Sequence, residues 1–199
     1  MHFKPSPQLV FGLGLAAALV VILGLVDRTG DLRGEYAKVR RRLAVLHEGA
    51  FVPPLRLATI LGDSVTLGEP AAAGRQLVFV FNTRCPFCKA TLPAWDSLAD
   101  SVRRLDPGIQ VLGLAIDSIA KVVDYVELNG LDFPVVSLLT MREIALYRAG
   151  AVPQTVVIGR GGRVRYATVG RLTSRAVLDS VFRALAPDSL SSPSAVARQ

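Results

Sequence analysis

Residues 76–89 read QLVFVFNTRCPFCK and pass from a strand pattern to a helix pattern around the chain's only two cysteines. Gln76–Phe81 is β-branched and aromatic, as in a strand buried on both faces of its sheet. Cys85 and Cys88 follow it, and helical periodicity begins at Pro86. A cysteine pair at the start of a helix favours thiol–disulfide exchange. Free backbone N–H groups and the helix dipole stabilise a thiolate on the first sulfur, and the second sulfur can resolve a mixed disulfide.

Strand and helix patterns alternate around these cysteines and predict one α/β domain over residues 55–186. The predicted strands are Ser64–Leu67, Gln76–Phe81, Ile109–Ile116, Phe133–Ser137, Gln154–Ile158 and Val164–Val169. The predicted helices are Pro86–Leu105 with a kink or offset at Pro93, Ile119–Leu128, Thr140–Tyr147, and one capped by Thr173 that ends near Ala186. Right-handed crossovers and a terminal antiparallel hairpin give a mixed central sheet flanked by helices. Cys85 then lies at the C-terminal end of a central strand, where open α/β sheets place their sites.

The N-terminal part has a different composition. Residues 1–8 form a short flank, and residues 9–26 carry no charge. At about 1.5 Å per residue this stretch covers roughly 27 Å, close to a bilayer core. A cleaved signal peptide is the alternative, but its apolar part is usually shorter and ends at a small-x-small site. We expect a single uncleaved transmembrane helix, a juxtamembrane helix or spacer over 27–54, and a disordered tail at 187–199.

The net charge of +7 does not indicate a nucleic-acid partner. Basic residues cluster just after the apolar stretch, where they meet lipid head groups, and no aromatic-and-basic platform for bases is present. By the positive-inside rule, the same cluster favours a cytoplasmic domain.

Other uses of the two cysteines fit the sequence less well. A zinc site needs further ligands, and the only histidines, His2 and His47, lie outside the predicted domain. No metal or organic cofactor is therefore expected. A structural bridge over two residues closes too small a loop to stabilise much. Further along, Pro153 precedes an apolar strand, and a trans loop proline is the ordinary interpretation there.

In combination these motifs resemble the thioredoxin fold, and with the N-terminal stretch they resemble the membrane-tethered TlpA/ResA-like redoxins. The resemblance covers about Leu55 to Ala186 and rests on residues 79–88, on Leu92-Pro93, and on Val152-Pro153-Gln154-Thr155. It implies a thiol–disulfide oxidoreductase on the outer side of a bacterial cytoplasmic membrane. Its partners would be protein disulfides or dithiols and a redox partner.

The resemblance also assigns roles to individual residues. Cys85 would be the exposed nucleophile and Cys88 the buried resolving thiol. Pro153 would be cis and lie beside the cysteines, and the backbone of Val152 would bind an extended substrate.

Three positions depart from the family pattern. Arg84 stands where Trp or Tyr is common, and it would favour a Cys85 thiolate if its side chain turned inward. Phe79 and Thr91 occupy positions where thioredoxins and ResA-like proteins carry acids. Asp117, at the end of the neighbouring strand, is a candidate substitute. Without an acid, deprotonating Cys88 is harder.

These departures leave two alternatives. A thioredoxin-fold binding or scaffold module with weak or no redox activity is the first. A thiol peroxidase is the weaker one, because peroxiredoxins place Thr and Pro where this chain has Asn82 and Val78, and Thr83 is one position out of place.

Overall fold

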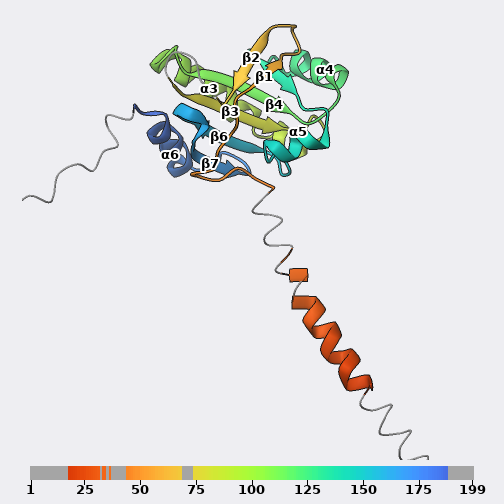
Figure 1. The fold of residues 1–199 in the computed structure, drawn as a ribbon. Coiled ribbons are helices and arrows are strands. Elements are labelled where there is room, and N and C mark those ends of the chain that lie inside the picture. The colour runs from red at the N-terminus through yellow and green to blue at the C-terminus, as the bar shows by residue number, and fades with distance from the viewer. Residues whose placement is uncertain (1–17, 32, 35, 37–43, 69–73, 188–199) are drawn as a thin grey trace, which may run out of the picture. The chain divides into compact units, whose positions relative to one another are not determined.

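The computed structural model of the chain describes residues 18–31, 33–34, 36, 44–68 and 74–187 (Figure 1). It divides into two units, Met1–Arg42 and Leu43–Gln199. In the first unit, residues 18–31 are helical. Within the described residues, no helix combines the length and the apolar character needed to cross a bilayer. Half of the predicted anchor, residues 9–17, lies outside the described part of the chain, as does nearly all of the predicted tail, so both stay predictions.

A five-stranded mixed sheet forms the centre of the second unit. Its strand order is β5 (Val135–Ser137), β4 (Gln110–Ala115), β3 (Gln76–Phe81), β6 (Gln154–Ile158) and β7 (Val164–Val169). β3 pairs in parallel with β4, and β4 with β5, whereas β6 is antiparallel to both β3 and β7. The expected parallel pair and terminal hairpin are thereby confirmed. β1 (Leu55–Ala58), which the sequence analysis did not predict, pairs with β2 (Ser64–Leu67) in a separate two-stranded sheet.

Two hydrophobic cores lie on opposite faces of the five-stranded sheet, because side chains alternate along a strand. Leu77, Phe79 and Phe81 of β3 pack into one core, together with α3 (Leu92–Leu105), α4 (Ile119–Asn129) and α6 (Arg175–Leu185). Val78 and Val80 pack into the other, with residues next to α5 (Met141–Leu146) and with the segment before β3. The apolar run Leu77–Phe81 within β3 follows from burial on both faces.

The predicted helix over residues 86–105 is divided into two helices, and the expected kink or offset takes the form of a break just before Pro93. α2 covers Pro86–Lys89, and α3 starts at Leu92 with Thr91 as its N-cap. Pro93 stands in the first turn of α3, where its missing N–H would have no partner inside the helix. The proline therefore starts a new helix rather than kinking an existing one.

The compact unit extends further towards the N-terminus than the predicted domain, which began at Leu55. Leu46, Ala50 and Val52 are buried in the second core. The backbone N–H of Val52 donates to the Gly162 carbonyl at 2.8 Å. A Cβ at Gly162 would stand 2.2 Å from the Val52 carbonyl oxygen, so glycine is required for this close approach.

Candidate active site

The two cysteines lie at the junction of β3 and α2. Cys85 is the N-cap of α2 and is half-buried, and its backbone N–H donates to the Asn82 carbonyl at 3.1 Å. Its Sγ accepts a hydrogen bond from the backbone N–H of Cys88 at 3.4 Å. Cys88 is completely buried, and both residues are free thiols in this structure. The first sulfur is therefore accessible at a helix start, and the second faces the core.

Burial makes Cys88 a weak acid. The pKa of the Cys88 thiol is raised from 9.0 to about 12, mainly by burial; a backbone hydrogen bond at Asn82 lowers it, and the neighbouring Cys85 acts in the same direction as burial. At neutral pH the Cys88 thiol keeps its proton.

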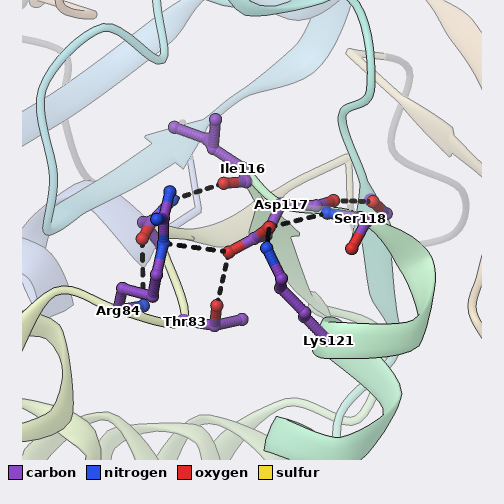
Figure 2. Close-up of polar contacts among 8 residues, drawn as sticks. Thr83, Arg84, Ile116, Asp117, Ser118 and Lys121 are labelled. Atoms are coloured by element: carbon purple, nitrogen blue, oxygen red, sulfur yellow. Dashed lines mark hydrogen bonds and ion pairs between the residues drawn. The ribbon is translucent and has the colours of Figure 1, made fainter.

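Asp117 connects the end of β4 to the loop that leads into Cys85 (Figure 2). Its carboxylate accepts hydrogen bonds from Thr83 Oγ1 at 2.6 Å, from the Ser118 backbone at 2.9 Å and from Lys121 Nζ at 3.3 Å. The Asp117 side chain is only 8% exposed. Burial acts to raise its pKa, but these hydrogen bonds outweigh burial, so the pKa of Asp117 lies below its ordinary value. Asp117 stays a carboxylate at neutral pH.

Arg84 points to Asp117 and to solvent. Its Nε lies 3.8 Å from Asp117 Oδ2, and its side chain is 78% exposed. The Asn82 side chain accepts a hydrogen bond from the Arg84 backbone N–H at 2.9 Å and donates one to the Ile116 carbonyl. The proposed tuning of the cysteines by Arg84 and Asp117 stays a prediction. What the geometry establishes is that both belong to a network that fixes residues 82–84.

Val152 and Pro153 reach the same edge of the sheet from β6. The Val152–Pro153 peptide bond is cis, as the resemblance implied. Val80 of β3 pairs with Gln154, so the register continues with Pro153 beside Phe81, the last residue of β3. Cys85 and Val152 both pack against the core that contains Cys88. The two motifs are therefore at one site.

The backbone around the proline is only partly used within the protein. The Pro153 carbonyl accepts a hydrogen bond from the Gly170 N–H at 2.8 Å. Val152 is half-buried, and its backbone N–H and carbonyl have no hydrogen-bond partner among the described residues. These two backbone groups are therefore not used by the rest of the described chain.

Gln154 belongs to the motif named in the sequence analysis, which gave it no role, and the structure shows that it is a supporting residue. It is fully buried, and its Nε2 donates to the Ala151 carbonyl at 2.7 Å and to the Arg148 carbonyl at 3.1 Å. Its Oε1 accepts from the backbone N–H of Leu46 at 3.2 Å. A glutamine at the start of a mostly apolar strand, directly after a proline, was the available signal. Its amide holds the loop that precedes Pro153.

Tyr125 was also missed. Its ring stacks on Phe81 at 5.6 Å, and its buried hydroxyl has no hydrogen-bond partner among the described residues. Burial, followed by the charges of Cys88 and Cys85, raises the pKa of Tyr125 to about 12. The sequence offered only its helical spacing, which is equally typical of a core residue.

The two positions that carry acids in related redoxins are occupied by neutral, buried side chains. Phe79 stacks on Trp95 at 5.0 Å. The Thr91 hydroxyl donates to the Phe87 carbonyl at 2.7 Å. In the part of the chain that the structure describes, no three His, Cys, Asp or Glu residues are grouped so as to hold a metal ion.

Comparison with known proteins identifies the family of the chain that carries this site. The model of the AhpC/TSA family matches residues 49–167. The chain belongs to the AhpC/TSA family. No curated protein matches this AhpC/TSA-family chain.

Comparison with solved structures shows the fold of this chain. The chain is similar to StoA from Bacillus subtilis, with 19% identity, a TM-score of 0.55, and coverage of 66% of this chain and 98% of that one. It is also similar to the thioredoxin domain of a thiol-disulfide oxidoreductase from Bacteroides vulgatus, with 17% identity, a TM-score of 0.56, and coverage of 71% and 99%. A secreted thiol-disulfide isomerase from Corynebacterium glutamicum gives 19% identity, a TM-score of 0.56, and coverage of 67% and 84%. The predicted thioredoxin-like fold is confirmed.

Proposed function

We propose that this AhpC/TSA-family protein is a thiol–disulfide oxidoreductase that exchanges its Cys85–Cys88 pair with protein substrates. The observation that carries the proposal is the pairing of an accessible Cys85, at the start of α2, with a fully buried Cys88. The cis Val152–Pro153 bond at the same sheet edge supports it.

The exchange balances without a metal or organic cofactor. The Cys85 thiolate attacks a substrate disulfide, forms a mixed disulfide and releases one substrate thiolate. Cys88 then loses its proton and attacks Cys85 Sγ, which releases the second substrate thiolate and leaves a Cys85–Cys88 disulfide. Two electrons pass to the substrate, and the two protons lost by the protein thiols balance its new thiolates. The reverse sequence oxidises a substrate dithiol.

Substrate contacts follow from the free backbone of Val152. An extended segment beside this residue could pair with its N–H and carbonyl as an added strand. Such pairing would place a substrate cysteine next to Cys85 without requiring a particular side-chain sequence.

Trapping of the mixed disulfide tests the proposal. In Cys88→Ser the resolving thiol is absent, so we expect partner proteins to accumulate on Cys85 as adducts that dithiothreitol releases. Cys85→Ser is the matched control and should trap nothing. If Cys88→Ser forms no adducts while partners still bind, the enzyme hypothesis fails.

That negative outcome would favour a binding or scaffold module, the second candidate function. The specific observation in its favour is the complete burial of Cys88, which raises the pKa of its thiol, in a site where the neutral Phe79 and Thr91 stand at the positions of the family's acids. A Cys85–Cys88 disulfide that does not re-form after reduction would support this alternative.

A thiol peroxidase is the weaker alternative. The Thr83 hydroxyl, one position away from the peroxiredoxin threonine, donates to Asp117. Hydrogen peroxide should therefore oxidise Cys85 no faster than it oxidises an ordinary thiol. Rapid consumption of hydrogen peroxide by the protein would favour the peroxidase hypothesis over the thiol–disulfide exchange hypothesis.

We further propose that residues 9–26 anchor the protein in a bacterial cytoplasmic membrane with the domain on its outer side. The uncharged sequence supports the anchor, and the resemblance to tethered redoxins supports the orientation. A reporter fused after Gln199 tests it: reporter activity confined to the cytoplasm would contradict the orientation. Release of the protein by carbonate washing would contradict the anchor.

A further inference from the structure

Exposed basic residues gather at the sheet edge that carries Cys85. β3, β4, β5 and β7 run in one direction, and β6 alone runs in the other. Residues that follow those four strands, and residues that precede β6, therefore lie around one edge. Neighbouring strands are about 5 Å apart, so the end of β5 is only about 10 Å from the end of β3.

The elements at this edge each contribute a cation. Two flank the cysteines, one lies in the first turn of α4, one lies in the first turn of α5, and one follows β7. All five are exposed: Arg84, Lys89, Lys121, Arg142 and Arg171. The hydrogen bond from Gly170 to the Pro153 carbonyl places the last of them next to the proline loop.

The acidic groups at the same edge are already engaged. Asp117 lies between Lys121 and Arg84, with Thr83 as a further hydrogen-bond donor. Glu143 caps the start of α5, where its Oε2 accepts the backbone N–H groups of Thr140 and Leu139 at 2.9 and 3.1 Å. The next acid along α4 is Asp124, five residues after Ile119, the first residue of the helix. At about 1.5 Å per residue it is about 7.5 Å further from the edge than the start of α4.

The opposite edge of the sheet also carries basic residues, and two of them are paired with carboxylates. There Arg75 pairs with Asp106 at 2.7 Å, and Arg103 pairs with Asp132 at 2.5 Å. Arg104 and Arg160 at that edge are exposed and have no acidic partner among the described residues. The edge around Cys85 is therefore distinguished by the position of its five cations beside the reactive cysteine, where the two nearby carboxylates are already engaged.

We propose that the edge around Cys85 receives acidic protein segments, so that the preferred substrate carries Asp or Glu beside its reactive cysteines. This inference rests on the proposed function and names the chemical class of its substrate. At an ionic strength of about 0.1 M, charges act over roughly 10 Å, which spans the edge from β3 to β5. Complementary charge at this range raises the rate of encounter and makes it sensitive to salt.

Two synthetic peptides with the same internal disulfide provide the test. One has four Glu residues flanking its cysteines, and the other has four Lys residues. With the reduced full-length chain in a non-ionic detergent, we expect the acidic peptide to be reduced at least about tenfold faster at low salt. The difference should largely disappear at about 0.5 M salt, where screening is stronger.

Matched charge reversals locate the effect. Arg142→Glu/Arg171→Glu replaces two cations of the Cys85 edge with carboxylates and leaves the cysteines unchanged. It should abolish most of the preference for the acidic peptide. Arg104→Glu/Arg160→Glu is the control with the same change in net charge. Arg104 lies at the far end of α3 and Arg160 in the turn between β6 and β7, both exposed and at the opposite edge. The control should change either rate by less than about twofold.

Reaction with bis(2-hydroxyethyl) disulfide, a small neutral disulfide, separates this inference from the function on which it rests. We expect it to react with the reduced protein equally in all three forms. If it does not react with the wild type, the proposed function fails. If it reacts but the two peptides are reduced at equal rates, or both double variants lose the preference equally, the acidic substrate class is wrong and the exchange function stands.

Discussion

Two loops form the candidate site, and they are built differently. Residues 82–84, before Cys85, are held by side chains and charges that come from the end of β4 and the start of α4. Residues 151–153, before β6, are held by the neutral amide of Gln154 and by the backbone of Gly170. The first loop fixes a reactive sulfur within an electrostatic network. The second keeps the backbone of Val152 free, which suits binding rather than chemistry.

The largest effect is expected in the pH dependence of the second chemical step, the attack of Cys88 on Cys85 Sγ of the mixed disulfide. Because the pKa of Cys88 is about 12, its thiolate fraction increases about tenfold for each pH unit below that value. We expect resolution of a Cys85 mixed disulfide to accelerate about a thousandfold between about pH 6 and pH 9. Stopped-flow measurement checks this, with attack by Cys85 in Cys88→Ser as the reference step. A plateau below about pH 8 would contradict the raised pKa.

The same group predicts a stability change in the reduced protein. The folded pKa of Cys88 is above the value of 9.0 expected for an unfolded chain, so the folded state holds this proton more tightly. The free energy of unfolding should therefore fall as pH rises from about 9 to about 12. Cys88→Ser should lack this part of the alkaline loss, which chemical denaturation at several pH values would show.

Removing Asp117 tests how strongly the first loop is held. Asp117→Ala leaves the Thr83 hydroxyl without its acceptor, so we expect a loss of about 1–3 kcal/mol in the free energy of unfolding. Asp117→Asn keeps an oxygen acceptor and should lose less. A loss below about 0.5 kcal/mol in Asp117→Ala would show that the network does not hold the loop.

The contribution of the Asp117 charge should depend on pH. Its folded pKa is below the ordinary carboxyl value of about 3.9, so this contribution is complete above that value and disappears as pH falls through the folded pKa. The stability difference between the wild type and Asp117→Asn should therefore shrink at pH values below about 4. A difference that is constant down to about pH 2 would contradict the lowered pKa.

The binding loop is tested by removing one backbone donor. Val152→Pro deletes the N–H that an extended substrate would use, whereas Val152→Ala keeps it. Loss of one hydrogen bond should raise the KM for a protein substrate about tenfold in Val152→Pro, while the rate with a small neutral disulfide is unchanged. Equal KM values in the two variants would count against strand addition, provided that circular dichroism shows both to be folded.

Arg84 should have the smallest effect on stability. Its side chain is 78% exposed and 3.8 Å from Asp117, and exposed ion pairs contribute about 0–1 kcal/mol. We expect Arg84→Ala to unfold within about 0.5 kcal/mol of the wild type in urea. A much larger loss would mean that the arginine helps to hold the loop.

Local patterns in the sequence predicted much of the sheet. The bounds of β3, β6 and β7 agree with the predicted strands because each is a short apolar or alternating run between turn residues. β1 was missed, since three of its four residues are exposed and it is too short to show a clear alternating pattern. Among the described residues its strand partner is β2 alone, so pairing in three dimensions is what identifies it.

The segment from Leu46 to Val52 could not be placed from the sequence for a similar reason. Its charged surroundings favoured a spacer, yet Leu46 binds Gln154 and Val52 binds Gly162, which are more than 100 residues away along the chain. Such contacts leave no local periodicity. Tyr125 likewise came to the site through helix packing against Phe81.

The sequence by itself determined the strand–Cys-x-x-Cys–helix unit and the apolar strands, because these depend on the properties of neighbouring residues. The tertiary structure decided which distant groups reach the cysteines. It brought Val152 and Pro153 to the end of β3, placed Asp117 against Thr83 and Arg84, and buried Cys88 completely. Reactivity depends on these environments, since burial and nearby charge set a pKa, and only the folded chain creates them.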